Sequence, residues 1–357
     1  MNAEDYFSPD YATARARFRD AANDVGAALH AIALPAKGPR DEALYIDIAW
    51  LGSANPRNVF LHTTGVHGVE AFTGSAVQLA LLEAAPLPGN QDALILVHVL
   101  NPYGMAWLRR TNENNVDLNR NFLVNGERWS GAPELYRTLD PLLNPPSAPS
   151  HDAFRARAAA AVLRHGFHRV KQAVAEGQYE FPRGLFFGGD SLQPGPKRYS
   201  EWLRSHLAHA QYVCSLDLHT GLGRSGTDTV MPDGHANVTP PPVLGDALCR
   251  EFVEVTGPSV AYTVRGGLGG ALQHILPDAD IDFVLQEIGT RAPLAVLHAL
   301  REENRWHFFG DASIVHPAKQ RLKEALCPAA RKWRRRAVAL GLELALAAAR
   351  WTFSRRG

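Results

Sequence analysis

A histidine and a glutamate stand three residues apart in the glycine-rich stretch FLHTTGVHGVEAFTGS, as His67 and Glu70. An apolar run precedes them and a helix-like pattern follows, so this turn is expected to join a strand to a helix. At this spacing both side chains point to the same side. Imidazole and carboxylate are zinc ligands, and a catalytic zinc site needs three protein ligands and a position open to water. Because HxxE patterns arise by chance, a third ligand must come from elsewhere.

Two further strand ends carry suitable side chains. His219 ends the apolar run in CSLDLHTGLG, and Glu287 lies near the end of DFVLQEIGT. Folds of the α/β class collect their active-site residues at such strand ends. A single histidine there is more commonly structural, but together with His67 and Glu70 it is interpreted as the third ligand. Glu287 could take a proton from a metal-activated water and pass it to a leaving amine.

Residues 101–122, NPYGMAWLRRTNENNVDLNRNF, interleave arginines and asparagines directly after an apolar strand. Arginine offers a rigid fork of donors that suits a carboxylate. Arg110, Asn119 and Arg120 are therefore candidates for an anion-binding wall, with a solvated charged loop as the alternative. Asp117 could accept a hydrogen bond from the second ring nitrogen of a ligand histidine.

A tyrosine precedes a glycine-rich stretch in AYTVRGGLGG, as Tyr262. It could move over a bound substrate and donate a hydrogen bond. A packed aromatic side chain explains the pattern equally well.

The elements that must position these groups alternate between strand and helix. NVFLHTTG and ALILVHVLNPYG are apolar runs typical of buried strands, and EAFTGSAVQLALLEAA between them is a helix candidate. QYVCSLDLHTG and IDFVLQEIGT continue the order. The sequence therefore predicts an α/β fold with a mixed, largely parallel twisted sheet and helices on both faces.

The predicted organisation has three parts. Residues 1–35 form an N-terminal helical extension, with a helix over about 11–31, and residues 36–315 form the catalytic domain. An insertion at about 125–200 interrupts the alternation of predicted strands and helices. It carries an Ala/Arg-rich helix at about 151–175 and is expected to lie over the sheet edge.

The third part, residues 316–357, is predicted to be helical. Its apolar run Ala337–Ala349 is interrupted by Glu343 and is too short to span a bilayer. The basic flanks permit a helix on a membrane surface. Packing against the domain or a second subunit is favoured.

Composition restricts the function classes. The chain has 357 residues, 46% hydrophobic and 20% charged, with a formal net charge of +1. These values exclude global disorder and give no field that attracts nucleic acid. Three widely spaced cysteines without a CxxC pair favour a reducing compartment, and the polar N-terminus lacks a secretory core. A cytoplasmic location is expected.

In this order, the motifs HGVEAFTGS, NPYG, RTNENNVDLNRNF, LDLHTG and QEIGT resemble the zinc carboxypeptidase superfamily, which includes the succinylglutamate desuccinylase and aspartoacylase amidohydrolases. The residues of these motifs are most similar to a bacterial branch of the superfamily that is catalogued as a domain of unknown function, and the similarity extends over about residues 40–310. The resemblance implies a zinc carboxypeptidase-like fold and one zinc ion per chain. It implies that His67, Glu70 and His219 are the zinc ligands and that Asp117 is the hydrogen-bond partner of the other ring nitrogen of His67.

The resemblance also assigns roles around the metal. Asn119 and Arg120 would hold the terminal carboxylate of the substrate. Arg110 would polarise the scissile carbonyl, with Arg109 as the alternative if the register shifts by one. Glu287 would be general base and acid.

Two further positions bear on the resemblance. Tyr262 would be the mobile tyrosine of the family. Val69 stands where the digestive carboxypeptidases have arginine, so a contact for longer peptides is missing, and Gly68 gives the HG start common in the amidohydrolases.

These inferences predict a zinc-dependent hydrolase of an amide bond adjacent to a free carboxylate. The substrate would be a small peptide or an N-acylated amino acid, and the enzyme could be a homo-oligomer. The alternatives are an N-acyl amino acid amidohydrolase of the desuccinylase or deacylase type and a non-catalytic relative that binds a carboxylate. A membrane-surface protein acting through its C-terminal helix is a further option.

Overall fold

The computed structural model describes residues 2–124, 126–232, 242–252 and 264–355. Within these residues the strands are β1 (Ala28–Lys37), β2 (Ala43–Gly52), β3 (Asn58–Thr64), β4 (Asp92–His98), β5 (Tyr212–Gly221), β6 (Asp228–Met231) and β7 (Asp280–Gly289). They form one sheet in the order β1-β2-β4-β3-β5-β7-β6. The central strands β4, β3, β5 and β7 are parallel, and the outer strands are antiparallel to their neighbours.

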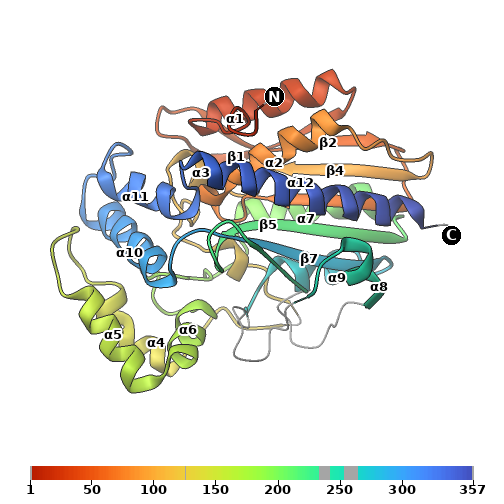
Figure 1. Ribbon diagram of the computed structural model, residues 1–357. Helices are drawn as coiled ribbons and strands as arrows, with labels where there is room; N and C mark the ends of the chain where they lie inside the picture. The colour runs from red at the N-terminus through yellow and green to blue at the C-terminus, as the bar shows by residue number, and fades with distance from the viewer. Residues whose placement is uncertain (1, 125, 233–241, 253–263, 356–357) are drawn as a thin grey trace.

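Helices cover both faces of this sheet (Figure 1). The described helices are α1 (Tyr11–Asp24), α2 (Ala71–Ala84), α3 (Pro102–Ala106), α4 (Glu134–Leu143), α5 (Phe154–His165), α6 (Phe167–Ala175), α7 (Pro194–Leu207), α8 (Pro242–Leu248), α9 (Leu268–Ile275), α10 (Pro293–Phe309), α11 (Pro317–Leu326) and α12 (Arg331–Ser354). One core contains residues of α1, α2 and α12, and the opposite core contains residues of α7 and α9. Neighbouring strand residues such as Val59 and Phe60 enter opposite cores, because side chains alternate along a strand. The predicted α/β class is confirmed.

The N-terminal region differs from its prediction. The helix expected over 11–31 ends at Asp24, and Gly26 follows with a φ of 73°. Residues Ala28–Lys37 then form the edge strand β1, paired with β2. Exposed and partly buried residues alternate along this strand, a period-two pattern that the helical interpretation did not take into account.

The insertion lies beside α10 at one end of the molecule (Figure 1). The helix expected over about 151–175 is broken into α5 and α6, because Gly166 adopts a φ of 83° that helical residues do not. Both helices line a cavity at the carboxyl ends of the central strands. The insertion therefore covers the ends of the strands.

The C-terminal helix α12 is long and apolar enough to cross a membrane by length and composition alone, yet 56% of its apolar window is buried in the protein. It packs on α2, β3 and β5. The approach is close, since a Cβ at Gly341 would lie 2.5 Å from a methyl carbon of Val77. In this fold α12 is a core helix.

Candidate metal centre

The predicted ligands come from neighbouring parallel strands. His67 and Glu70 follow β3, and His67 directly precedes the short 3-10 helix Gly68–Glu70 that leads into α2. His219 is near the end of β5, in register with Glu287 on β7. Because the carboxyl ends of β3, β5 and β7 meet at one edge of the sheet, these groups converge there.

Three side chains meet closely enough to hold one metal ion. One ligand atom each from His67, Glu70 and His219 lies within 4.8 Å of the others, and all three residues are buried. The Nδ1 atom of His67 is 3.0 Å from one oxygen of Glu70, and Nδ1 of His219 is 3.3 Å from the other. The two Nδ1 atoms are 3.2 Å apart. Both imidazoles thus direct Nδ1 to a common point.

A carboxylate holds the outer nitrogen of each imidazole. Nε2 of His67 is 3.0 Å from Asp117, and Nε2 of His219 is 2.8 Å from Asp217. Such a partner sets the ring orientation and makes the inner nitrogen a better ligand. Two imidazoles oriented in this way, together with the carboxylate of Glu70, suit a divalent ion such as zinc. Asp217 was not predicted, although its position two residues before His219 on a strand signals a shared face.

The charges in this cluster support one another. Burial opposes ionisation of Glu70, but the two imidazoles outweigh it and hold the pKa of this carboxyl below its usual range. Burial lowers the pKa of His219, yet Asp217 and Glu70 raise it well above its usual value. Glu70 is therefore a carboxylate at neutral pH, the form that a metal ligand must have.

Glycine allows the ligand-bearing turn to touch the next loop. A Cβ at Gly68 would lie 2.1 Å from the backbone carbonyl carbon of Gly104 in α3. The backbone N–H groups of Gly68 and Val69 donate to the carbonyl oxygens of Arg110 and Arg109, at 3.1 and 2.9 Å. The HG and NPYG motifs therefore pack against each other and fix the loop that carries Arg110.

Of the two adjacent arginines, Arg110 faces the site. Its guanidinium donates to Asp117 at 2.9 Å and to Glu70 at 3.1 Å, and its side chain lines the cavity. Arg109 is buried elsewhere and donates to Glu303 at 3.0 Å. The structure thus resolves the alternative that the sequence left open about which arginine faces the cavity.

The predicted anion-binding pair is separated by the fold. Asn119 lines the cavity, and its side-chain oxygen accepts from the backbone N–H of Leu268 at 3.2 Å. Arg120 is 0% exposed and does not line the cavity. Its guanidinium donates to the carbonyl oxygens of Ala175 and Asn119. Arg120 therefore anchors the C-terminal end of α6 through the carbonyl group of Ala175.

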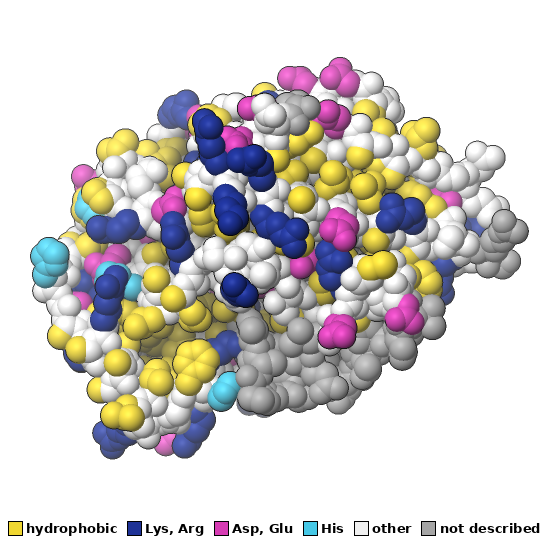
Figure 2. All heavy atoms as spheres, viewed as in Figure 1, with side chains coloured by type: hydrophobic (Ala, Val, Ile, Leu, Met, Phe, Trp, Pro, Cys, Tyr) yellow, Lys and Arg dark blue, Asp and Glu magenta, His cyan; other side chains and the backbone are white. Residues whose placement is uncertain are grey.

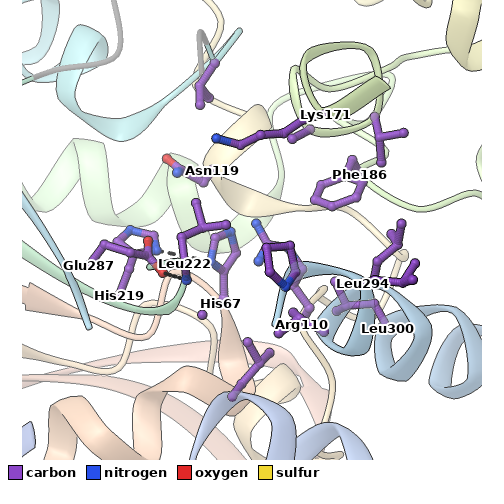
Figure 3. A pocket seen from close by; sticks show the side chains of 18 of the residues that line it. His67, Arg110, Asn119, Lys171, Phe186, His219, Leu222, Glu287, Leu294 and Leu300 are labelled. Atoms are coloured by element: carbon purple, nitrogen blue, oxygen red, sulfur yellow. Dashed lines mark hydrogen bonds between the residues drawn. The ribbon is translucent and has the colours of Figure 1, made fainter. Parts of the chain in front are cut away.

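Lys171 of α6 lines the cavity instead, and the sequence analysis did not single it out. Figure 3 shows it and Asn119 on the same side of the cavity. Burial lowers the pKa of Lys171, and the nearby Glu287 counteracts this shift. Lys171 stands between Val170 and Gln172, close to Arg169, so no sequence signal set it apart from the other polar residues of the insertion. Tyr262 lies outside the described residues.

Glu287 has the properties of a proton carrier. Burial, and then the negative charge of Glu70, raise its pKa to about 7. The backbone N–H of Leu222 donates to its Oε1 at 2.8 Å and orients the carboxyl group. A group with this pKa takes up and releases a proton readily near neutral pH.

The site opens into a cavity of about 480 Å³, which falls in the usual range for small-molecule sites. His67, His219 and Glu287 stand at one side of it (Figure 3). Apolar residues of α4, α5, α6 and α10 form a large part of the remaining lining. Figure 2 shows an opening among hydrophobic side chains beside the insertion.

Comparison with known structures supports the fold. The chain is similar to bovine thrombin-activatable fibrinolysis inhibitor in complex with tick carboxypeptidase inhibitor, with 12% identity, a TM-score of 0.52 and 99% of each chain covered. Carboxypeptidase A from Helicoverpa armigera is 16% identical, with a TM-score of 0.45 and coverage of 97% of this chain and 75% of that chain. Murein-tripeptide amidase MpaA from Escherichia coli O157 is 16% identical, with a TM-score of 0.39 and coverage of 80% and 96%. At 12% identity, the similarity to the first of these structures concerns the fold alone.

Comparison by sequence gives the family. No curated protein matches the chain. A family match extends over residues 7–340, almost the whole chain, and confirms the resemblance to a branch of unknown function. The chain belongs to the family described as "Protein of unknown function (DUF2817)".

Proposed function

We propose that this protein is a zinc-dependent hydrolase that cleaves an amide bond adjacent to a free carboxylate. The observation that carries the proposal is the convergence of His67, Glu70 and His219 beside Glu287 at one side of a cavity. A zinc ion held by these three ligands would supply a Lewis acid that activates water.

The protein's own residues would move the proton and stabilise charge. Glu287 accepts a proton from the attacking water at its carboxylate and returns it to the leaving nitrogen, as a group with a pKa of about 7 can do in both directions. Arg110, held by Asp117 and Glu70, donates to the carbonyl oxygen as negative charge develops there.

Lys171 and Asn119 would bind the free carboxylate. They are polar groups on the same side of the cavity, and Lys171 supplies a positive charge that is partly removed from water. A charge-assisted contact in this setting fixes the substrate relative to Glu287.

The test combines metal analysis with one substitution. Protein purified without chelator should contain about one zinc ion per chain, as a site with three protein ligands binds one ion. Glu287→Gln should keep the metal and lose about 10²- to 10⁴-fold in kcat on amide substrates. The control Glu201→Gln changes an exposed carboxylate on α7 and should retain full activity.

Two results would contradict the mechanism: absence of bound zinc, or full activity in Glu287→Gln. Binding of a carboxylate compound in calorimetry without turnover of any amide would instead favour a non-catalytic relative. Peptides with free C-termini, tested beside succinyl- and acetyl-amino acids, would separate a carboxypeptidase from a deacylase.

A further inference from the structure

The cavity next to the metal centre is far more apolar than the hydrolysis of a polar substrate requires. Leu294, Leu297 and Leu300 of α10 line it together with leucines, valines and alanines of α4, α5 and α6. Among the described lining residues, the ionisable side chains are those of the metal centre with Arg110 and Glu287, and Lys171. The apolar wall is therefore built largely by the insertion and α10.

The apolar wall of the cavity begins beside Arg110, which is proposed to contact the carbonyl oxygen of the substrate. The ring of Phe186 lies 5.2 Å from the guanidinium carbon of Arg110. Figure 3 shows Arg110 between the metal centre and the pair Leu294 and Leu300, with Asn119 and Lys171 on another side. A substrate whose carbonyl oxygen meets Arg110 and whose carboxylate meets Lys171 would direct its acyl substituent toward the leucines of α10.

The entrance of the cavity is also lined by apolar side chains. Phe167 is 48% exposed and Leu294 is 38% exposed, and both line the cavity. Figure 2 shows hydrophobic side chains along part of the rim of this opening. Large apolar side chains gathered at the mouth of a cavity mark a surface that receives an apolar ligand.

We propose that the substrate is an amino acid N-acylated by a long aliphatic chain, and that this chain occupies the cavity between the insertion and α10. The inference rests on the proposed function and names its substrate class. Hydrolysis breaks the amide C–N bond, adds the water oxygen to the acyl carbon and transfers a proton to the leaving nitrogen. The products are a fatty acid and a free amino acid. A cavity of about 480 Å³ accommodates a ligand of this size.

Chain length is the variable that tests the inference. N-acetyl, N-octanoyl and N-dodecanoyl derivatives of a panel of amino acids are compared below the concentrations at which they form micelles. Each buried methylene should raise kcat/KM by about fourfold until the cavity is filled, because burial of one methylene contributes about 0.8 kcal/mol.

A pair of neighbouring alanines on α5 provides matched variants. Ala161 lines the cavity, whereas Ala160 is exposed and does not. Ala161→Trp should abolish the gain with chain length, and Ala160→Trp should preserve it. Thermal denaturation of both variants shows whether each is folded. Calorimetry on Glu287→Gln protein with N-dodecanoyl-alanine and N-acetyl-alanine gives the same comparison without turnover.

The outcomes separate this inference from the proposed function. Turnover of the acetyl compound with no gain, or a loss, for longer chains would overturn the inference and leave the hydrolase intact. A gain that Ala161→Trp does not reduce would also overturn it. Absence of turnover on every amide would contradict the proposed function, and the calorimetric series would then decide whether the cavity binds an aliphatic chain.

Discussion

At the scale of single residues, burial distinguishes groups that the sequence presents as equivalent. Arg110 and Arg120 lie in one motif, yet Arg110 lines the cavity and Arg120 is enclosed by backbone carbonyl groups. A positive charge nevertheless reaches the cavity near Asn119 through Lys171, which comes from the insertion. We therefore assign the carboxylate-binding role to Lys171 and a structural role to Arg120.

This assignment predicts different effects for two substitutions. Lys171→Met should raise KM for carboxylate substrates about 10- to 100-fold, because a charged hydrogen bond contributes about 1.5–3 kcal/mol. Arg120→Met should instead lower the free energy of unfolding by about 3 kcal/mol, because the buried carbonyl oxygens of Ala175 and Asn119 lose their donor. The buried carboxylate of Asp117 also loses a positive charge 4.0 Å away. Steady-state kinetics and urea denaturation measure the two effects.

The control is Lys197→Met, which changes an exposed lysine on α7 and should alter neither quantity. The assignment fails if Arg120→Met raises KM without loss of stability while Lys171→Met has no effect.

At the scale of elements, the site depends on the contact between the ligand turn and α3. Gly68 and Gly104 approach so closely that neither accepts a side chain, since a Cβ on Gly104 would lie 2.9 Å from Cα of Gly68. The same contact places the ligand turn beside Arg110 through backbone hydrogen bonds. The position of the metal ligands is therefore set by backbone packing.

Gly68→Ala should disturb this packing. The added methyl group would overlap backbone atoms, so we expect a loss of about 1–3 kcal/mol in the free energy of unfolding and weaker zinc binding. Gly195→Ala on α7 is the control, because its Cβ would meet no atom closer than 3.7 Å. Denaturation and competition with a zinc chelator test both variants, and equal behaviour of the two would refute the packing argument.

At the scale of the whole molecule, the fold encloses histidines in its sheet. His62 on β3 and His98 on β4 are fully buried, and burial lowers the pKa of each to about 4 from the ordinary value of 6.5. Between these two pH values the unfolded chain binds protons that the folded protein does not. The stability that the neutral histidines provide is present above pH 6.5 and is lost as the pH falls toward 4.

The free energy of unfolding should therefore fall between pH 6 and pH 5 by about 1.2 kcal/mol for each of these histidines. His62→Asn should remove one such contribution from the slope. His209 is exposed in the loop between α7 and β5, so His209→Gln should leave the pH dependence of the free energy of unfolding unchanged. Urea denaturation across this range measures it, and an unaltered slope in His62→Asn would contradict the burial argument.

Much of the architecture follows from local patterns. Apolar runs that end in turn residues predicted the α/β sheet, and two strand-end motifs predicted that His67, Glu70 and His219 would meet. These predictions succeed because parallel strands bring their carboxyl ends to one edge whatever lies between them. The edge strand β1 was missed because its alternation is weak and it adjoins a true helix.

The sequence by itself thus determined the class of fold and the three converging donor groups, since both depend on short-range periodicity and strand order. Only the tertiary structure decided which charges reach the cavity. Burial of Arg120, entry of Lys171 and the apolar wall of α10 arise from packing between segments far apart in the chain. No local pattern records how such segments pack, because the free energy of burial depends on the neighbours that folding brings together.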